Sequence, residues 1–451
     1  YAWGGLIMDP ITLGIIVAVG LIVLMAIGTP IAFALGGVSL LALLYDRGLP
    51  ELTYFGETFF DRIAEFGFVA IPMFILMGAA VASSPTGRDL YRSLDLWMGR
   101  LPGGLAVSNI GACSIFAALS GSSPATCAAI GKMGIPEMRT RGYPDGVAAG
   151  CIAAGGTLGI LIPPSVTMII YGISTETSIG RLFIAGVVPG FMLAGLFMIW
   201  TMIACKMAGG YNNPLAASAE KLKENIKQNV DSNMKALVRV LPFLGVVAGI
   251  LFALYGGVAT PSEAAGVGAF LCLALAIVIY RMWQLGPIKL IMRDSLRESV
   301  MIMLVIATAE VFAYALSSMF ITQTVAAAIA DLEVNRWVLM GIINLFLLVA
   351  GFFLPPVAVI VMTAPILLPI ILAADFDPYW FAVILTINLE IGLITPPVGL
   401  NLFIIKGIAP DISLRDILMG SLPYALCMVL GILLLCLFPG IALWLPNLIM
   451  G

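Results

Sequence analysis

The stretch 155–172, GGTLGILIPPSVTMIIYG, places two adjacent prolines inside an otherwise membrane-grade apolar run, and a second copy, IGLITPPVGLNLFIIKG, lies at 391–407. Proline removes an amide donor and clashes with the preceding helical turn, and the residue before it avoids the helical conformation. Each copy therefore predicts a helix, an unwound break and a second helix. The matching residues are Gly159, Pro163 and Pro164 in the first copy and Gly392, Pro396 and Pro397 in the second.

Unwound backbone at membrane depth is tolerated only where protein or a watery cavity satisfies its free amides and carbonyls. Paired interruptions in two halves of a membrane protein are the best sequence pointer to a transporter's binding site. Two kinked helices with a purely structural role are the alternative. The shared Gly-x-x-x-Pro-Pro order favours the binding site.

The composition indicates a polytopic membrane protein, because 61% of the 451 residues are hydrophobic and only 10% are charged. A net charge of −3 provides no basic surface for nucleic acid. The chain has no histidine, so zinc chemistry of the HExxH kind and Ser-His-Asp catalysis are excluded. The sequence Gly131-Lys132-Met133 lacks the rest of a phosphate-binding loop. We therefore expect neither an enzyme nor an ATPase, and no cofactor apart from a coupling ion.

The order of apolar and polar segments predicts an all-α fold with two inverted-topology repeats, each with five spans and one re-entrant hairpin. A polar stretch at 207–239 contains Lys221, Lys223 and Lys227 and is expected to link the halves in the cytoplasm. The first repeat is 1–206, with a hairpin at 104–140 and a broken helix at 146–175. The second repeat is 240–451, with a hairpin at 337–374 and a broken helix at 379–407.

Seven further segments belong to this prediction. Two spans at 11–27 and 31–45 open the first half. In the second half we expect a first span at 241–257, an amphipathic piece at 287–297 separate from a span at 298–318, an arm at 321–336, and one last span at 421–447.

The distribution of Lys and Arg sets the orientation. With the amino terminus outside, four basic residues fall on the periplasmic side, so the remaining 18 of the 22 are cytoplasmic (22 − 4). This is the positive-inside bias. Both termini are thus expected in the periplasm, in a bacterial inner membrane. The four periplasmic residues are Arg47, Arg62, Arg181 and Arg336.

The breaks offer oxygen atoms. Free carbonyls, together with the hydroxyls of Ser165, Thr167 and Thr395, suit a hard cation such as sodium, and half-helix amino termini suit an anionic group. Four asparagines in the same elements are open to two interpretations, ligand contact or hydrogen bonds between helices. They are Asn109, Asn344, Asn388 and Asn401.

Three acids fall in or beside apolar segments. Glu390 lies two residues before Gly392, and it is open to contact with ion or substrate or to a structural hydrogen bond. Glu310 has no partner nearby in sequence. Glu263 follows a turn proline and is expected to cap a helix start.

Over essentially its whole length, and most specifically in three stretches, the chain resembles the large membrane subunit (DctM type) of the TRAP transporters, the tripartite ATP-independent periplasmic uptake systems. The stretches are LSGSSPATCAAIG at 119–131, LGILIPPSVTMIIYGISTETSIGRLFIAGVVPG at 158–190 and NLEIGLITPPVGLNLFI at 388–404. The resemblance implies an elevator mechanism for a small organic anion such as a carboxylate, coupled to sodium. It also implies two partners: a small four-span membrane subunit and a periplasmic substrate-binding protein.

The resemblance also implies site residues. One sodium would lie between the first hairpin tip and the first break, and a second between the second tip and the second break. This chain departs from the family's pattern at two positions: some relatives have an acid where it has Thr126, and many have an acid where it has Pro355. Carbonyls and hydroxyls therefore carry more of the expected coordination. The expected sodium ligands are Ser120, Gly121, Ser122, Gly159 and Pro163, and Gly351, Leu354, Gly392, Thr395 and Val398; the expected substrate contacts are Ser123, Thr126, Ser165, Thr167, Pro355, Pro356, Asn388, Glu390 and Asn401.

Two other functions fit the pattern less well. A stand-alone sodium/dicarboxylate carrier of the divalent-anion type shares hairpins and inverted repeats but needs no partner. A channel would build its filter from symmetric copies of one pore loop, whereas the two copies here are expected to be inverted.

Overall fold

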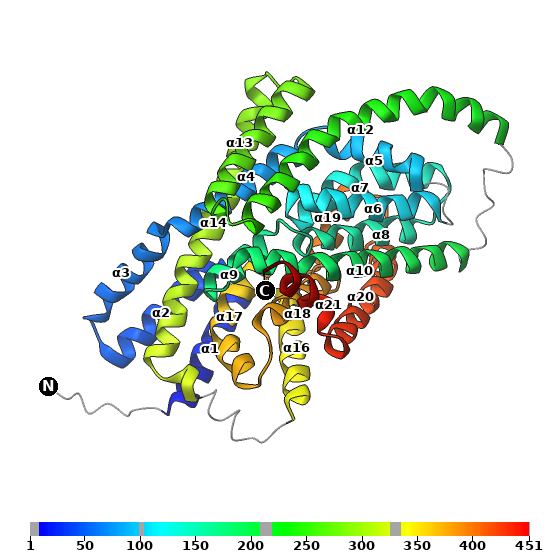
Figure 1. Cartoon of the computed structure of the whole chain (residues 1–451). Coiled ribbons are helices and arrows are strands. Elements are labelled where there is room, and N and C mark those ends of the chain that lie inside the picture. Colours follow the sequence, from blue (N-terminus) through cyan, green and yellow to red (C-terminus); the bar gives the residue numbers. More distant parts are fainter. Residues whose placement is uncertain (1–8, 99–102, 208–218, 325–334, 451) are drawn as a thin grey trace.

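The computed structural model describes residues 9–98, 103–207, 219–324 and 335–450, and these residues form helices without any strand (Figure 1). In the first half, the helices are α1 (Pro10–Ala26), α2 (Ile31–Arg47), α3 (Glu51–Ala64), η1 (Phe66–Val69), α4 (Ala70–Ala82), α5 (Thr86–Met98), α6 (Gly104–Ser120), α7 (Ser123–Thr140), α8 (Asp145–Thr157), η2 (Leu158–Ile160), α9 (Val166–Ser174) and α10 (Ile179–Met207).

The second half follows with a comparable order of long helices, a pair of shorter ones and an interrupted helix. Its helices are α12 (Ala219–Tyr255), α13 (Pro261–Tyr280), α14 (Leu285–Ser318), α16 (Arg336–Phe353), α17 (Pro356–Ala373), α18 (Pro378–Leu393), α19 (Leu400–Ile408), α20 (Leu414–Leu437) and α21 (Gly440–Met450).

Three helices differ from the expected segments. Helix α12 begins inside the expected linker, because its first turns are rich in Ala, Glu, Lys and Leu, which are strong helix formers. Helix α14 is one continuous helix, since no proline or glycine separates the amphipathic piece from the span. The expected last span is two helices, because Pro439 and Gly440 end α20. The expected arm at 321–336 lies largely outside the described residues.

Within the described residues, six helices are long and apolar enough to cross a membrane, and two bent pairs raise the number to eight. One of these pairs, Pro356–Ala364 and Ile366–Ala373, bends by 59° at Pro365. Large apolar side chains are exposed along α1, α13, α14 and α20. Exposed apolar surface of this extent suits a lipid environment, so the protein is a multi-span membrane protein.

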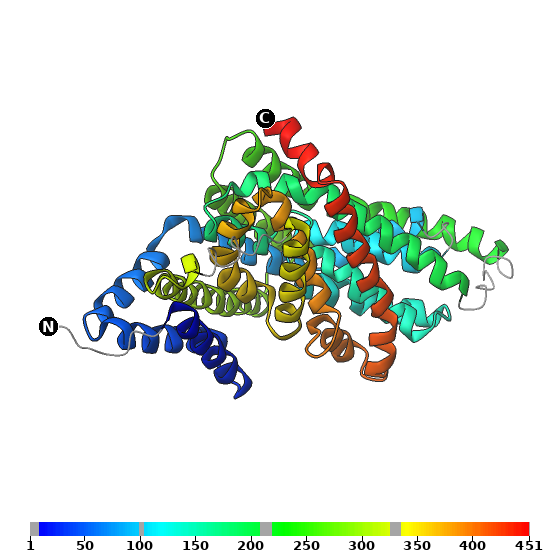
Figure 2. The same ribbon diagram turned by 90° about the horizontal axis from the view of Figure 1, so that it is seen from below.

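The most buried elements are α6, α8 and α18, which lie at the centre of the molecule. Small residues permit close contact between helices there: a Cβ added at Gly150 of α8 would lie 2.1 Å from the carbonyl oxygen of Gly420 in α20. Figures 1 and 2 both place α1, α2 and α3 at one end of the molecule, away from this centre.

Helices from different halves pack in corresponding pairs. Helix α4 contacts α13 while α2 contacts α14, and α7 contacts α19 while α9 contacts α17. Within each half, α6 contacts α8 and α16 contacts α18. The two hairpins and the two interrupted helices therefore form one body.

Candidate functional site

The first hairpin tip lies against the first break. A Cβ added at Gly159 would lie 2.5 Å from the carbonyl oxygen of Ser122, and one added at Gly121 would lie 2.7 Å from that of Pro164. Gly121 also has a φ of +62°, which favours glycine. Tip and break therefore meet backbone to backbone, and only glycine fits at these two positions.

Hydroxyl groups line this first contact. The hydroxyls of Ser120 and Thr126 are hydrogen bonded to each other at 2.7 Å, and Thr126 Oγ1 donates to the carbonyl of Ser122 at 2.8 Å. Ser120, Ser123 and Thr126 are buried. The site thus gathers neutral oxygens that belong to the first tip.

The hydroxyls of the first break are already engaged. Ser165 Oγ and Thr167 Oγ1 both donate to the carbonyl of Ile160, the last residue before the chain unwinds. Ser165 also accepts from the amide of Met168 and so caps α9. These two side chains hold the break together rather than pointing into a ligand space.

The second tip lies against the second break in the same manner. A Cβ added at Gly392 would lie 2.2 Å from the carbonyl oxygen of Gly351. The amide of Val398 donates to the carbonyl of Phe352 at 3.3 Å, which joins the break to the tip directly. Thr395 Oγ1 donates to the carbonyl of Ile391 at 2.6 Å. In both breaks the two prolines are joined by a cis peptide bond.

The two breaks differ in exposure. Every residue from 158 to 165 is buried, whereas Pro396, Pro397 and Val398 are exposed, as is Pro355 in the second tip. Leu354 is half-buried and Pro356 is buried. The second site is therefore open to its surroundings and the first is closed.

Two asparagines join helices across the site. Asn401 Nδ2, just after the second break, donates to Ser123 Oγ at 2.9 Å and to the carbonyl of Ala153 at 3.2 Å, whereas its buried Oδ1 has no hydrogen-bond partner among the described residues. Asn388 Nδ2 donates to Asn344 Oδ1 and to the carbonyl of Ile384. Asn401 thus connects the second break to the first tip, whereas Asn388 faces α16.

The acids have distinct environments. Glu390 is fully buried in α18, and neither of its carboxyl oxygens has a hydrogen-bond partner among the described residues. Glu263 forms a capping box with Thr260, which confirms the expected cap. Glu310 lies in α14, away from both breaks in the sequence.

An ion-pair network lies at the end of the first hairpin. Arg139 contacts Asp145 at 2.9 Å and Asp411 at 2.5 Å, so it joins the end of α7, the start of α8 and the loop after α19. The hydrogen bond from the Arg139 guanidinium holds the pKa of Asp411 below its usual range. This network connects the two halves outside the membrane-spanning segments.

Three contacts at the site have little or no signal in the sequence. The carbonyl of Ser120 lies 2.3 Å from a Cβ added at Gly78 of α4, Phe352 contributes its carbonyl to the second break, and Ser421 Oγ donates to the carbonyl of Ile394 at 3.2 Å. Two of these contacts involve only backbone carbonyls, which every residue type has, so the sequence cannot indicate them. Ser421 lies in an apolar span, where a lone hydroxyl is a weak signal.

Two interrupted helices, each met at its break by a hairpin tip inside a multi-span helical body, define a membrane transport protein. The family described as "Tripartite ATP-independent periplasmic transporter, DctM component" matches residues 18–441. The chain belongs to this family, which comprises transport proteins rather than enzymes.

Relatives and solved structures agree. The chain is 37% identical to the C4-dicarboxylate TRAP transporter large permease protein DctM of Pseudomonas aeruginosa, over 86% of this chain and 88% of that protein. It is 34% identical to the isethionate TRAP transporter permease protein DctMQ of Oleidesulfovibrio alaskensis, over 93% of this chain and 64% of the relative. The solved YdaH transporter of Alcanivorax borkumensis has a TM-score of 0.62 at 16% identity, over 88% and 90% of the two chains, which shows a shared fold.

Proposed function

We propose that this chain is the membrane subunit of a sodium-coupled secondary uptake system for a small organic anion. The observation that carries the proposal is the pair of tip-to-break contacts, Gly159 against Ser122 and Gly392 against Gly351. Each contact brings a backbone carbonyl of a hairpin tip against the backbone of an interrupted helix, close to its break. Such paired interruptions are typical of the substrate and ion sites of secondary transporters.

The donor chemistry fits sodium. The first contact gathers the carbonyls of Ser122 and Pro164 and the hydroxyl of Ser120, and the second gathers the carbonyl of Gly351 and the hydroxyl of Thr395. Neutral oxygens are the ligands that hard cations accept. The sodium ion is cargo here, and its binding would tighten each tip against its break.

The anion is proposed to bind beside the first tip, where the hydrogen bond from Asn401 to Ser123 joins the two halves. The amino terminus of α7 begins at Ser123 and that of α19 at Leu400, so two helix dipoles favour negative charge there. The relatives are named for C4-dicarboxylate and isethionate, which supports a small organic anion. Ser165 and Thr167 would reach such a ligand only by giving up their bonds to Ile160.

The transport step is proposed to be an elevator movement of the hairpins and broken helices past the remaining helices. The corresponding contacts of α4 with α13 and of α2 with α14 support two inverted repeats. The family implies two partners, a small membrane subunit and a periplasmic binding protein, and the greater length of the DctMQ relative is consistent with the first. The positive-inside bias of the Lys and Arg residues supports an orientation with both termini in the periplasm.

Uptake in proteoliposomes tests this function. We expect substrate accumulation driven by an inward sodium gradient only when a substrate-loaded binding protein is supplied together with the small membrane subunit. Robust sodium-driven uptake by the purified chain alone would favour the stand-alone carrier. Passive flux in both directions with no dependence on a gradient would indicate a channel.

Orientation is tested separately by labelling single cysteines. Cysteines introduced at Asn225 in α12 and Asn447 in α21 should react with an impermeant thiol reagent from opposite sides of the membrane. Reaction from the same side would contradict the inverted repeats, whatever the outcome of the uptake assay.

A further inference from the structure

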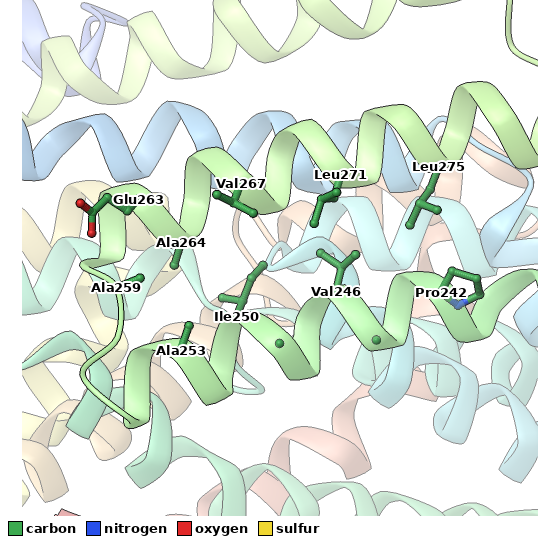
Figure 3. A pocket seen from close by; sticks show the side chains of 12 residues that line it. Pro242, Val246, Ile250, Ala253, Ala259, Glu263, Ala264, Val267, Leu271 and Leu275 are labelled. Atoms are coloured by element: carbon green, nitrogen blue, oxygen red, sulfur yellow. The ribbon is translucent and has the colours of Figure 1, made fainter.

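Helices α12 and α13 enclose an apolar groove of about 470 Å³ that is separate from both breaks (Figure 3). Its walls are apolar side chains and glycines, with one charged residue at its end. The lining residues are Pro242, Gly245, Val246, Gly249, Ile250, Ala253, Ala259, Glu263, Ala264, Val267, Leu271 and Leu275.

The floor of the groove carries no side chain at two positions, Gly245 and Gly249. A Cβ added at Gly245 or Gly249 would meet no heavy atom within 4 Å, so the two glycines leave room that no other part of the described structure fills. Val267 on the opposite wall is exposed. Both helices are long and apolar enough to span a membrane, so a groove between them would lie at membrane depth.

The length of the groove decides between two occupants. From Glu263 to Leu275 the wall rises 12 residues along α13, or about 18 Å. Half of the hydrocarbon core is about 15 Å thick, whereas a spanning helix must cross about 30 Å. The groove therefore covers one leaflet, which fits an acyl chain better than a partner's transmembrane helix.

The end of the groove carries a negative charge. Figure 3 shows Glu263 at one end, with Pro242 and Leu275 toward the other. Glu263 Oε2 accepts from the amide and the hydroxyl of Thr260 at 2.8 and 2.9 Å. Among the described residues Oε1 has no hydrogen-bond partner, and the side chain is exposed. A carboxylate so placed, where α13 begins, complements an ammonium group.

We propose that this groove binds one acyl chain of a phospholipid with a primary-amine headgroup, whose ammonium pairs with Glu263. The apolar walls take the chain, and the free carboxylate oxygen selects the headgroup. The bound lipid would hold α12 and α13 at their present separation, and α13 packs in turn against α4.

Native mass spectrometry of the purified transporter tests the proposal with two lipids, phosphatidylethanolamine and phosphatidylglycerol of identical acyl chains. We expect retention of phosphatidylethanolamine in preference. Gly249→Leu should abolish retention of both lipids, because the new side chain fills the groove without a clash. Gly266→Leu is the matched control, because its Cβ also meets nothing within 4 Å and it does not line the groove.

Glu263→Gln separates charge from structure, because glutamine at this position keeps the capping box. We expect it to reduce the preference for phosphatidylethanolamine by about two- to fivefold, the range of exposed ion pairs, while leaving total lipid retention unchanged. Unchanged preference in Glu263→Gln, or unchanged retention in Gly249→Leu, would overturn the proposal. Crosslinking of a cysteine at Gly249 to another protein chain in native membranes would assign the groove to a helix instead.

Discussion

The two breaks share a Gly-x-x-x-Pro-Pro pattern but differ in how their free backbone is satisfied. In the first, the carbonyl of Ile160 accepts from two buried hydroxyls, and no residue from 158 to 165 reaches the surface. In the second, Pro396, Pro397 and Val398 are exposed, and one amide bonds to the opposing tip. The same Gly-x-x-x-Pro-Pro pattern can thus form a buried break or an exposed one, and the helices that pack around it determine which.

The two breaks are therefore stabilised by different groups. The closed first break is fixed by its own side chains, whereas the open second break depends on its tip and on α19. Helix α19 is anchored in turn to the first half through Asn401 and Ser123. Removing the hydroxyl side chains of the first break should therefore mainly lower the stability of the fold, whereas changes in the second break should mainly affect ion and substrate binding.

The largest effect on transport is expected when a methyl group is added between a hairpin tip and its break. Gly159→Ala and Gly392→Ala each place a methyl group within 2.5 Å or less of a backbone oxygen, so the tip must move away. We expect uptake in proteoliposomes to fall more than about tenfold in both, as misplacement at a functional site does. The unfolding temperature should fall more for Gly159→Ala, because every residue of the first break from 158 to 165 is buried.

The control is Gly407→Ala in α19, where an added Cβ meets nothing within 4 Å. It should transport like the unmodified protein. Normal uptake by Gly392→Ala would show that the second tip-to-break contact is not needed for transport.

The next effect concerns the stability of the closed break. In a Ser165→Ala, Thr167→Ala double variant the buried carbonyl of Ile160 loses both hydroxyl donors. We expect the free energy of unfolding to fall by about 1–3 kcal/mol, the cost of an unsatisfied buried group. Chemical or thermal denaturation in detergent measures it.

Ser299→Ala in α14 is the matched control, because its buried hydroxyl bonds only to the carbonyl of Ser295 in its own helix. If the double variant is no less stable than this control, the first break is not fixed by its hydroxyls.

Sodium affinity should be affected more at the second site than at the first, whereas stability is affected more at the first. Ser120→Ala and Thr395→Ala each remove one neutral oxygen from a proposed site, so both should raise the sodium concentration needed for half-maximal uptake. We expect a change of about three- to tenfold, because one hydrogen-bonding group of this kind contributes about 1 kcal/mol. Thr395→Ala at the open second site should cause the larger change. In Ser120→Ala the first site still keeps the neighbouring hydroxyl of Thr126. Equal sodium dependence in both variants and the unmodified protein would contradict both assignments.

A smaller effect is expected for Glu390→Gln. The carboxyl group is fully buried and does not bond to either tip or break, so its removal leaves the proposed sodium ligands in place. We expect sodium dependence to change by less than about twofold, within the variation of a substitution away from the site. Uptake that persists without sodium, follows an imposed pH gradient and collapses in this variant would instead make Glu390 the coupling group.

Sequence patterns reveal the interruptions but not their surroundings. The proline pairs and glycine spacing indicated where α8 and α18 end, because proline acts on its own backbone. The exposure of Val398 and the burial of Ser165 depend on which distant helices cover each break, and hydropathy is alike in both stretches. The sequence does not predict the continuity of α12, because its first turns are polar and polarity is typical of a linker. Those same residues are good helix formers.

The smallest effect tests how α19 is anchored at its far end. Because Arg139 holds the pKa of Asp411 below its usual value of about 3.9, the pair stabilises the folded state above that pH and is lost as pH falls through the lower folded pKa. Asp411→Asn should therefore lower the melting temperature slightly at pH 7, and this difference should shrink as the pH falls below about 3.9. Arg139 keeps Asp145 as a partner, which limits the loss. Asp375→Asn is the control, since Asp375 is fully exposed and lies 3.9 Å from Arg336. A difference at Asp411 that grows in acid would show that the second break is not anchored through this ion pair.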